Sequence, residues 1–164
     1  MLPVRKALAA LAITTALTSA AAAAEGLVTQ KNIPLAMAEV IAQAALAQCQ
    51  SMGFKVSVAV VDRAGLTLVM LRGDGAGMHT PEGAERKAFT ARTFSQPSAD
   101  FVKRLAERPD TAGSVHYTRV LALPGGLPIK AGNEVVGAVG VSGSPGKDDV
   151  CSQAGIDKVA DQLK

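Results

Sequence analysis

The chain has very few aromatic residues. It contains no tryptophan, one tyrosine and four phenylalanines, which together make up 3% of its 164 residues. Proteins that bind single-stranded nucleic acids usually stack aromatic side chains on the bases and line the backbone with lysine and arginine. This sequence has neither the aromatic residues nor a basic tract. Nucleic acid is therefore excluded as an expected partner.

Cysteine and histidine are also scarce, with two residues of each type. Cys49 and Cys151 form no C-x-x-C motif, and the absence of C-x-x-C-H excludes covalent attachment of c-type haem. In an oxidising compartment the two cysteines can form a disulfide. Closing a loop of about 100 residues would stabilise the folded state by up to about 4–5 kcal/mol, because it restricts the unfolded chain. The alternative is a pair of buried small hydrophobic side chains. We expect the disulfide.

A nucleotide-binding loop is missing, although Gly140–Asp149 (GVSGSPGKDD) superficially resembles one. The P-loop motif requires G-x-x-x-x-G-K followed by Ser or Thr. Counting back from Gly146, the first glycine position holds Val141, and Asp148 stands where the hydroxyl residue belongs. We expect this segment to be a plain turn into a terminal helix, whose positive N-terminus Asp148 and Asp149 complement.

Motifs of hydrolases and metal enzymes are incomplete as well. Ser142 lies in Gly140-Val141-Ser142-Gly143, which misses the G-x-S-x-G pattern by one residue. The two histidines, His79 and His116, lack the helical H-x-x-x-H spacing of a metal site. The sequence thus favours a binding protein over a catalyst.

The sequence has one long apolar run, at its N-terminus. Arg5 and Lys6 precede the apolar residues 7–17, and Ala22-x-Ala24 has the form of a cleavage site. This pattern predicts a secretory signal peptide over residues 1–24 and a mature chain of residues 25–164. An uncleaved anchor is the alternative, but the run is short for a membrane span. We expect a periplasmic or secreted protein with no membrane segment after cleavage.

The mature chain is nearly neutral. Removing Arg5 and Lys6 from the 17 basic residues leaves 15, against 14 acidic residues, for a net charge of +1. The remaining 140 residues (164 − 24) are enough for one domain with a proper hydrophobic core. High contents of alanine, valine and glycine suggest extensive burial, including burial in a subunit interface.

Hydrophobic periodicity predicts four helices. Asn32 and Thr80 are the expected N-caps of the first two, and the buried sides of the first and last are expected to include Val40 and Val150. Small residues form a narrow stripe on the second helix. The four predicted helices cover residues 35–52, 81–94, 98–107 and 148–163, and the small-residue stripe consists of Ala84, Ala88 and Ala91.

Runs rich in β-branched residues predict five strands. The first is apolar on both faces, which indicates a central strand, and Gly65 suits the positive φ of the turn that follows. Hairpins without crossover helices imply an α+β fold with an antiparallel five-stranded sheet and helices packed on it, not a Rossmann fold. The strands are expected at residues 55–62, 66–72, 119–123, 126–130 and 135–142.

Several segments resemble a known family in order along the mature chain. They are VSVAVVDRAG, LRGDGAG, ERKAFTARTF, GGLPIKAGNEVVGAVGVSG and DDVCSQAGID. The chain resembles the GlcG/HbpS-like family of small haem-binding proteins, related to the C-terminal domain of PduO-type proteins. The resemblance implies a profilin-like fold, assembly into homo-oligomers and, for some members, haem binding.

Noncovalent haem b requires an axial donor, apolar walls and cations for the propionates. His79, in the glycine-rich loop GAGMHTPEG, is the leading candidate ligand of the iron, with Met78 beside it as a sulfur donor. The alternative is a solvent-exposed loop histidine. Other expected contributors to the site are Arg86, Lys87, Arg92 and Lys130 as cations, and His116 or Tyr117 as alternative ligands.

These observations lead to one functional expectation. The chain is expected to be an exported protein that binds haem or a related tetrapyrrole and acts as a carrier, buffer or sensor component. Two alternatives stay open: an enzyme or accessory subunit acting on a small organic acid or corrinoid, and a structural oligomeric module.

Overall fold

The structure, a computed structural model, describes residues 26–164, so the predicted signal peptide lies outside the described part. None of the helices in residues 26–164 is both long enough and apolar enough to span a membrane. The elements, in chain order, are α1 (Leu35–Ser51), β1 (Ser57–Asp62), β2 (Thr67–Arg72), α2 (Thr80–Phe94), α3 (Ser98–Glu107), η1 (Pro109–His116), β3 (Gly126–Ala131), β4 (Glu134–Ser142), α4 (Asp148–Asp157) and η2 (Ala160–Gln162), where η denotes a 3-10 helix.

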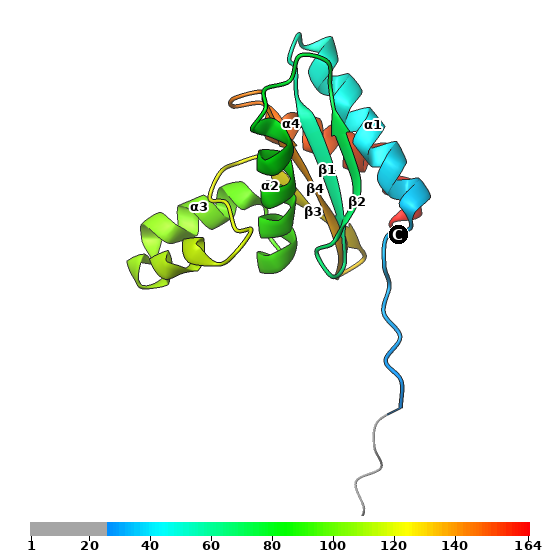
Figure 1. The fold of residues 1–164 in the computed structure, drawn as a ribbon. Helices are drawn as coiled ribbons and strands as arrows, with labels where there is room; N and C mark the ends of the chain where they lie inside the picture. The colour runs from blue at the N-terminus through cyan, green and yellow to red at the C-terminus, as the bar shows by residue number, and fades with distance from the viewer. Residues whose placement is uncertain (1–25) are drawn as a thin grey trace, which may run out of the picture.

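The fold is α+β, with one antiparallel sheet in the order β2-β1-β4-β3. Helix α2 packs on one face of this sheet, and α1 and α4 pack on the other, while α3 lies to the side of α2 (Figure 1). Strand β1 is central and almost completely buried, as predicted. Gly65, in the turn after β1, has the expected positive φ, at 78°.

The sheet has four strands rather than the five expected, because residues 119–123 form no strand. Arg119 has a φ of 71°, in the left-handed region, which breaks an extended chain. The next backbone groups bind side chains of α2: Arg86 Nη2 donates to the Val120 carbonyl at 2.8 Å, and the Leu121 N–H donates to Thr90 Oγ1 at 2.8 Å. These bonds replace the ladder bonds that a strand would make.

The helices differ from the predictions in four details. Asn32 does not cap α1, since its Oδ1 accepts the backbone N–H of Arg63 at 3.0 Å. Thr80 is the first helical residue of α2 rather than the residue before it. Val40 and Val150 are 43% and 47% exposed, so both lie outside the buried stripes, and α4 ends at Asp157 rather than at residue 163.

Small residues lie between α2 and the sheet, and they include the alanine stripe expected on the second helix. Ala84, Ala88 and Ala91 are fully buried, and so is Ala138 on β4. A Cβ placed on Gly140 would overlap the backbone of Ala84 and Ala88. The absence of a side chain at Gly140 therefore sets how closely α2 lies on β4.

A disulfide joins the two helices on the opposite face. It links Cys49 of α1 to Cys151 of α4, with the Cα atoms 5.5 Å apart, and both cysteines are fully buried. Gly155 lies against the backbone carbonyl of Ile41, so α1 and α4 also approach each other closely without the covalent link.

We predict that Gly140→Ala destabilises the fold by about 3 kcal/mol, the upper end of the range for overpacking, because the added methyl group meets backbone rather than a mobile side chain. Urea unfolding measures the change. Gly113→Ala is the matched control, since a Cβ at Gly113 meets nothing within 4 Å. Equal stability of the two variants would contradict this account of the α2–β4 contact.

Candidate ligand pocket

An open pocket of about 560 Å³ lies at one end of the sheet. Here β1 begins, β4 ends, and both α2 and α4 have their N-termini. Its size is within the range of small-molecule sites. Its lining includes Lys55, His79, Lys87, Leu123, Asp148 and Asp149.

His79 lies at the rim of this pocket, immediately before α2. The Thr80 hydroxyl donates to the Gly77 carbonyl at 2.8 Å and lies 2.8 Å from Ser57 Oγ. Because the Thr80 proton is engaged with Gly77, Ser57 is the donor in the second bond. These two bonds fix the start of α2 against β1 and leave the imidazole of His79 exposed at the pocket.

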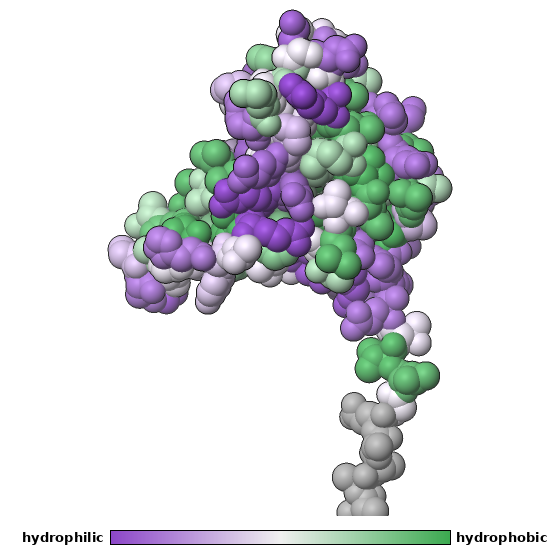
Figure 2. Space-filling view, in the orientation of Figure 1, coloured by the Kyte–Doolittle hydropathy of each residue, from purple (hydrophilic) through white to green (hydrophobic). Residues whose placement is uncertain are grey.

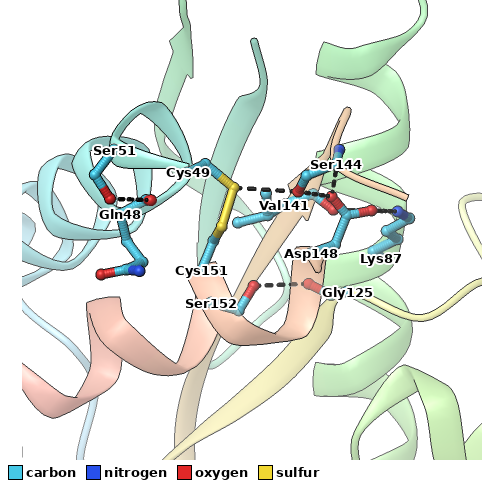
Figure 3. Close-up of a disulfide and its surroundings, with 10 residues drawn as sticks. All are labelled: Gln48, Cys49, Ser51, Lys87, Gly125, Val141, Ser144, Asp148, Cys151 and Ser152. Carbon is cyan, nitrogen blue, oxygen red and sulfur yellow. Dashed lines mark hydrogen bonds and ion pairs between the residues drawn. A yellow bond between two sulfur atoms is a disulfide. The ribbon is translucent and has the colours of Figure 1, made fainter. Parts of the chain in front are cut away.

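A buried ion pair forms part of the pocket wall. Lys87 Nζ lies 2.7 Å from Asp148 Oδ2, and the two side chains are only 5% and 9% exposed. Lys87 Nζ also donates to the Val141 carbonyl at 3.1 Å. The other carboxylate oxygen, Asp148 Oδ1, accepts the backbone N–H and the hydroxyl of Ser144 at 2.9 and 2.6 Å (Figure 3). Each charge therefore has its opposite charge and further hydrogen bonds.

This pair changes the interpretation of Lys87 and Asp148. Lys87 was expected to offer a positive charge to a ligand, but Asp148 already neutralises that charge. Asp148 was expected only to complement a helix N-terminus, whereas it also connects α4 to α2 and to the turn at Ser144. No sequence signal identifies the pair, because its members are 61 positions apart.

Asp149 holds the loop that forms another wall of the pocket. Its Oδ1 accepts the N–H of Gly125 at 2.8 Å, and Ser152 Oγ donates to the Gly125 carbonyl at 2.8 Å. Both bonds fix the loop that carries Leu123 and Pro124 into the pocket lining. Burial raises the pKa of the Asp149 carboxyl, with a smaller contribution in the same direction from Asp148 and an opposing one from the Gly125 N–H.

The other residues proposed for the site are dispersed. Met78, beside His79, is 92% exposed. Arg86 donates to Glu82 and to the Val120 carbonyl, away from the pocket lining. Two further proposed contributors lie elsewhere: His116 ends η1, and Lys130 lies near the β3–β4 turn, at the opposite end of the sheet.

Lys55 is a pocket residue that the sequence reasoning missed. It lies just before β1, is exposed, and forms no ion pair with any residue in the range 26–164. Its side chain passes along Gly75, where a Cβ would lie 3.1 Å from the Lys55 Nζ. A polar residue at the start of a buried central strand was the available signal. Lys55 thus offers the positive charge that Lys87 does not.

Metal-binding groups do not cluster in the described part of the chain. No three side chains of His, Cys, Asp and Glu in residues 26–164 come together as a metal ion would need. His79 is the imidazole that the ligand pocket contains.

Comparison with known families identifies the fold and its relatives. A family model described as haem-degrading protein HbpS-like matches residues 33–157, which is most of the chain. The chain belongs to the HbpS-like family. HbpS of Streptomyces reticuli, crystallised as a double mutant, is 41% identical and superposes with a TM-score of 0.75, covering 82% of this chain and 93% of that one.

Two other relatives of this HbpS-like chain are informative. An uncharacterised 15.0 kDa protein of Citrobacter freundii is 33% identical over 120 residues, covering 72% of this chain and 84% of that protein. PduOC, crystallised as a haem complex, is 23% identical with a TM-score of 0.70, covering 77% of this chain and 94% of that one. At this identity, the PduOC structure shows a shared fold.

We predict that Lys87→Met destabilises the protein by about 3–5 kcal/mol, because it leaves the buried Asp148 carboxylate without its opposite charge. Lys103→Met on α3 is the control: Lys103 also pairs with an aspartate, at 3.2 Å, but is 72% exposed. Its expected effect is within about 0.5 kcal/mol. Urea unfolding compares the two, and similar losses would refute the special role of the buried pair.

The raised pKa of Asp149 predicts a pH-dependent effect of Asp149→Asn. The folded carboxyl keeps its proton to a higher pH than the unfolded one, so its ionisation at neutral pH opposes folding. Asparagine retains the oxygen that accepts the Gly125 N–H. The variant should therefore be more stable than the parent at pH 7.

This advantage should shrink as the pH falls through the raised pKa and vanish below the ordinary value of 3.8, where both states are protonated. Urea unfolding from pH 7 to pH 3.5 measures the difference. Asp74→Asn, on an exposed turn, serves as the control. An advantage of Asp149→Asn that grows toward acid pH would have the wrong sign.

Proposed function

We propose that this HbpS-like chain binds haem noncovalently in the ligand pocket, with His79 as the axial ligand of the iron. Membership of a family described by haem chemistry supports this proposal. The observation that carries it is the position of His79, an exposed imidazole at the rim of a pocket of suitable size. A neutral imidazole is a common axial ligand of haem iron.

The rest of the lining fits a flat, amphipathic ligand. Leu123, Pro124 and Pro145 provide apolar surface. Lys55 provides a positive charge with no partner in the described residues, which suits a propionate carboxylate. Lys87 does not serve in this proposal, since Asp148 neutralises it. Bound haem would supply the iron centre, and the chain's own residues would bind and orient it.

Export and self-association belong to the same proposal. The signal-peptide pattern of residues 1–24 supports a periplasmic or secreted location. Met78 and Leu123, which are 92% and 50% exposed beside the pocket, offer apolar surface that a second copy of the chain could cover. We propose a homo-oligomeric haem carrier, buffer or sensor component outside the cytoplasm.

Haem titration of the mature protein, followed by absorbance, tests the proposal. We expect a saturable Soret band that shifts or weakens in His79→Ala, because the axial donor is lost. His116→Ala is the matched control, since His116 lies outside the pocket lining, and it should leave the band unchanged. Lys55→Gln should keep the spectrum and weaken the affinity several-fold.

The possible results separate the parts of the proposal. The absence of any saturable band would overturn haem binding in this protein. A band of unchanged position and intensity in His79→Ala would retain haem binding and reject His79 as the ligand. Circular dichroism of each variant verifies that the fold is intact.

A further inference from the structure

A second pocket lies at the other end of α2. It has a volume of about 400 Å³ and is lined by Gln30, Asn32, Arg63, Ala64 and Arg92. These residues come from the N-terminal segment, the β1–β2 turn and the last turn of α2. At a rise of 1.5 Å per residue, about 18 Å of helix separates Arg92 from the start of α2 at the ligand pocket. We call this second site the Arg63–Arg92 pocket.

Arg63 is held in place on one side only. Its Nη1 donates to the Lys31 carbonyl at 3.3 Å and to Glu134 at 3.1 Å, and its backbone N–H donates to Asn32 Oδ1 at 3.0 Å. Both protons of Nη1 are thus engaged. Nη2 has no partner among residues 26–164, so one edge of the guanidinium is available.

Arg92 is less well satisfied than Arg63. Its guanidinium makes no ion pair or side-chain hydrogen bond with any other described residue, and its Nε is shielded from water without a partner. Burial lowers the pKa of Arg92, and the nearby positive charge of Arg63 lowers it further. The Nη groups of Arg92 also have no hydrogen-bond partner among the described residues, and unlike Nε they are not shielded from water. Their N–H donors are therefore accessible to the oxygens of a ligand.

Two carboxylates lie near the pocket, and neither satisfies Arg92. Glu134 is bonded to Arg63. Asp62 attracts Arg92 through space, but its Oδ1 accepts the N–H of Leu66 at 2.9 Å. An anion placed between the two guanidinium groups would relieve their mutual repulsion. The flat fork of an arginine matches the oxygens of carboxylates and phosphates.

We propose that the Arg63–Arg92 pocket binds a small oxyanion, a carboxylate or a phosphate. Arg92 and the available edge of Arg63 hold the oxygens, and the side-chain amides of Gln30 and Asn32 lie at the same pocket. This site is separate from the proposed haem site and does not depend on it.

NMR titration of the mature protein tests this proposal, with inorganic phosphate and succinate as separate probes at constant ionic strength. We expect saturable shifts of the Arg92 Nε–H signal and of the Ala64 amide for at least one probe. The probe that saturates at the lower concentration identifies the class of anion. In Arg92→Gln, the dissociation constant read from the Ala64 amide should rise at least tenfold.

Arg108→Gln is the matched control, since Arg108 also lies near an aspartate but is 63% exposed and outside the pocket. Its affinity should equal that of the parent protein. The absence of saturable shifts with both probes, or equal affinity in Arg92→Gln, would overturn the proposal.

Ala64→Glu provides a second test that does not remove an arginine. Ala64 is exposed and lines the pocket, so the new carboxylate can occupy the place of the anion. We expect this variant to remain folded and to lose anion binding. Binding equal to that of the parent in folded Ala64→Glu would also overturn the proposal, including in the case where Arg92→Gln fails to fold.

Discussion

The buried ion pair between Lys87 and Asp148 is the interaction on which the pocket end of the molecule depends. It joins the middle of α2 to the first turn of α4, and its hydrogen bonds extend to the end of β4 at Val141 and to the turn at Ser144. Neither charge could remain in this place alone, because an unpaired buried charge is strongly unfavourable. Helix α2 and the continuous segment from the end of β4 to the start of α4, which are distant in sequence, therefore have to come together at the same point.

The close packing of α2 on the sheet is what allows this pair to form. Lys87 lies within the part of α2, between Ala84 and Ala88, where Gly140 and the alanine stripe let the helix backbone approach β4. A bulkier contact would hold the helix away from the strand and move Lys87 Nζ away from the Val141 carbonyl. The small residues of the interface and the charged pair beside them thus form a single arrangement, with the ligand pocket next to it.

Much of this fold could be predicted from the sequence, because it depends on local patterns. Hydrophobic periodicity located the four helices, and runs of β-branched residues located four of the strands. The predicted strand at residues 119–123 was wrong because Arg119 adopts a left-handed conformation. Its guanidinium donates hydrogen bonds to Glu85 and to the Gly65 carbonyl.

The site was less predictable, because it is formed by long-range contacts. The glycine-rich loop pointed to His79 as a candidate, and the structure places His79 at a pocket. The partner of Lys87 and the role of Lys55 followed only from the three-dimensional arrangement. Local sequence patterns contain no information about which charges meet across 61 positions.

The disulfide determines how the chain would respond to cleavage of its backbone. Because it joins the first helix to the last, everything between Cys49 and Cys151 is a covalently closed ring. The exposed segment that includes η1 lies within this ring. A single proteolytic cut there would open the ring without releasing a fragment, so the nicked protein would remain one covalent molecule, heavier by one water, until the disulfide was reduced. Both halves would stay attached to the same α1–α4 layer through the bond between Cys49 and Cys151.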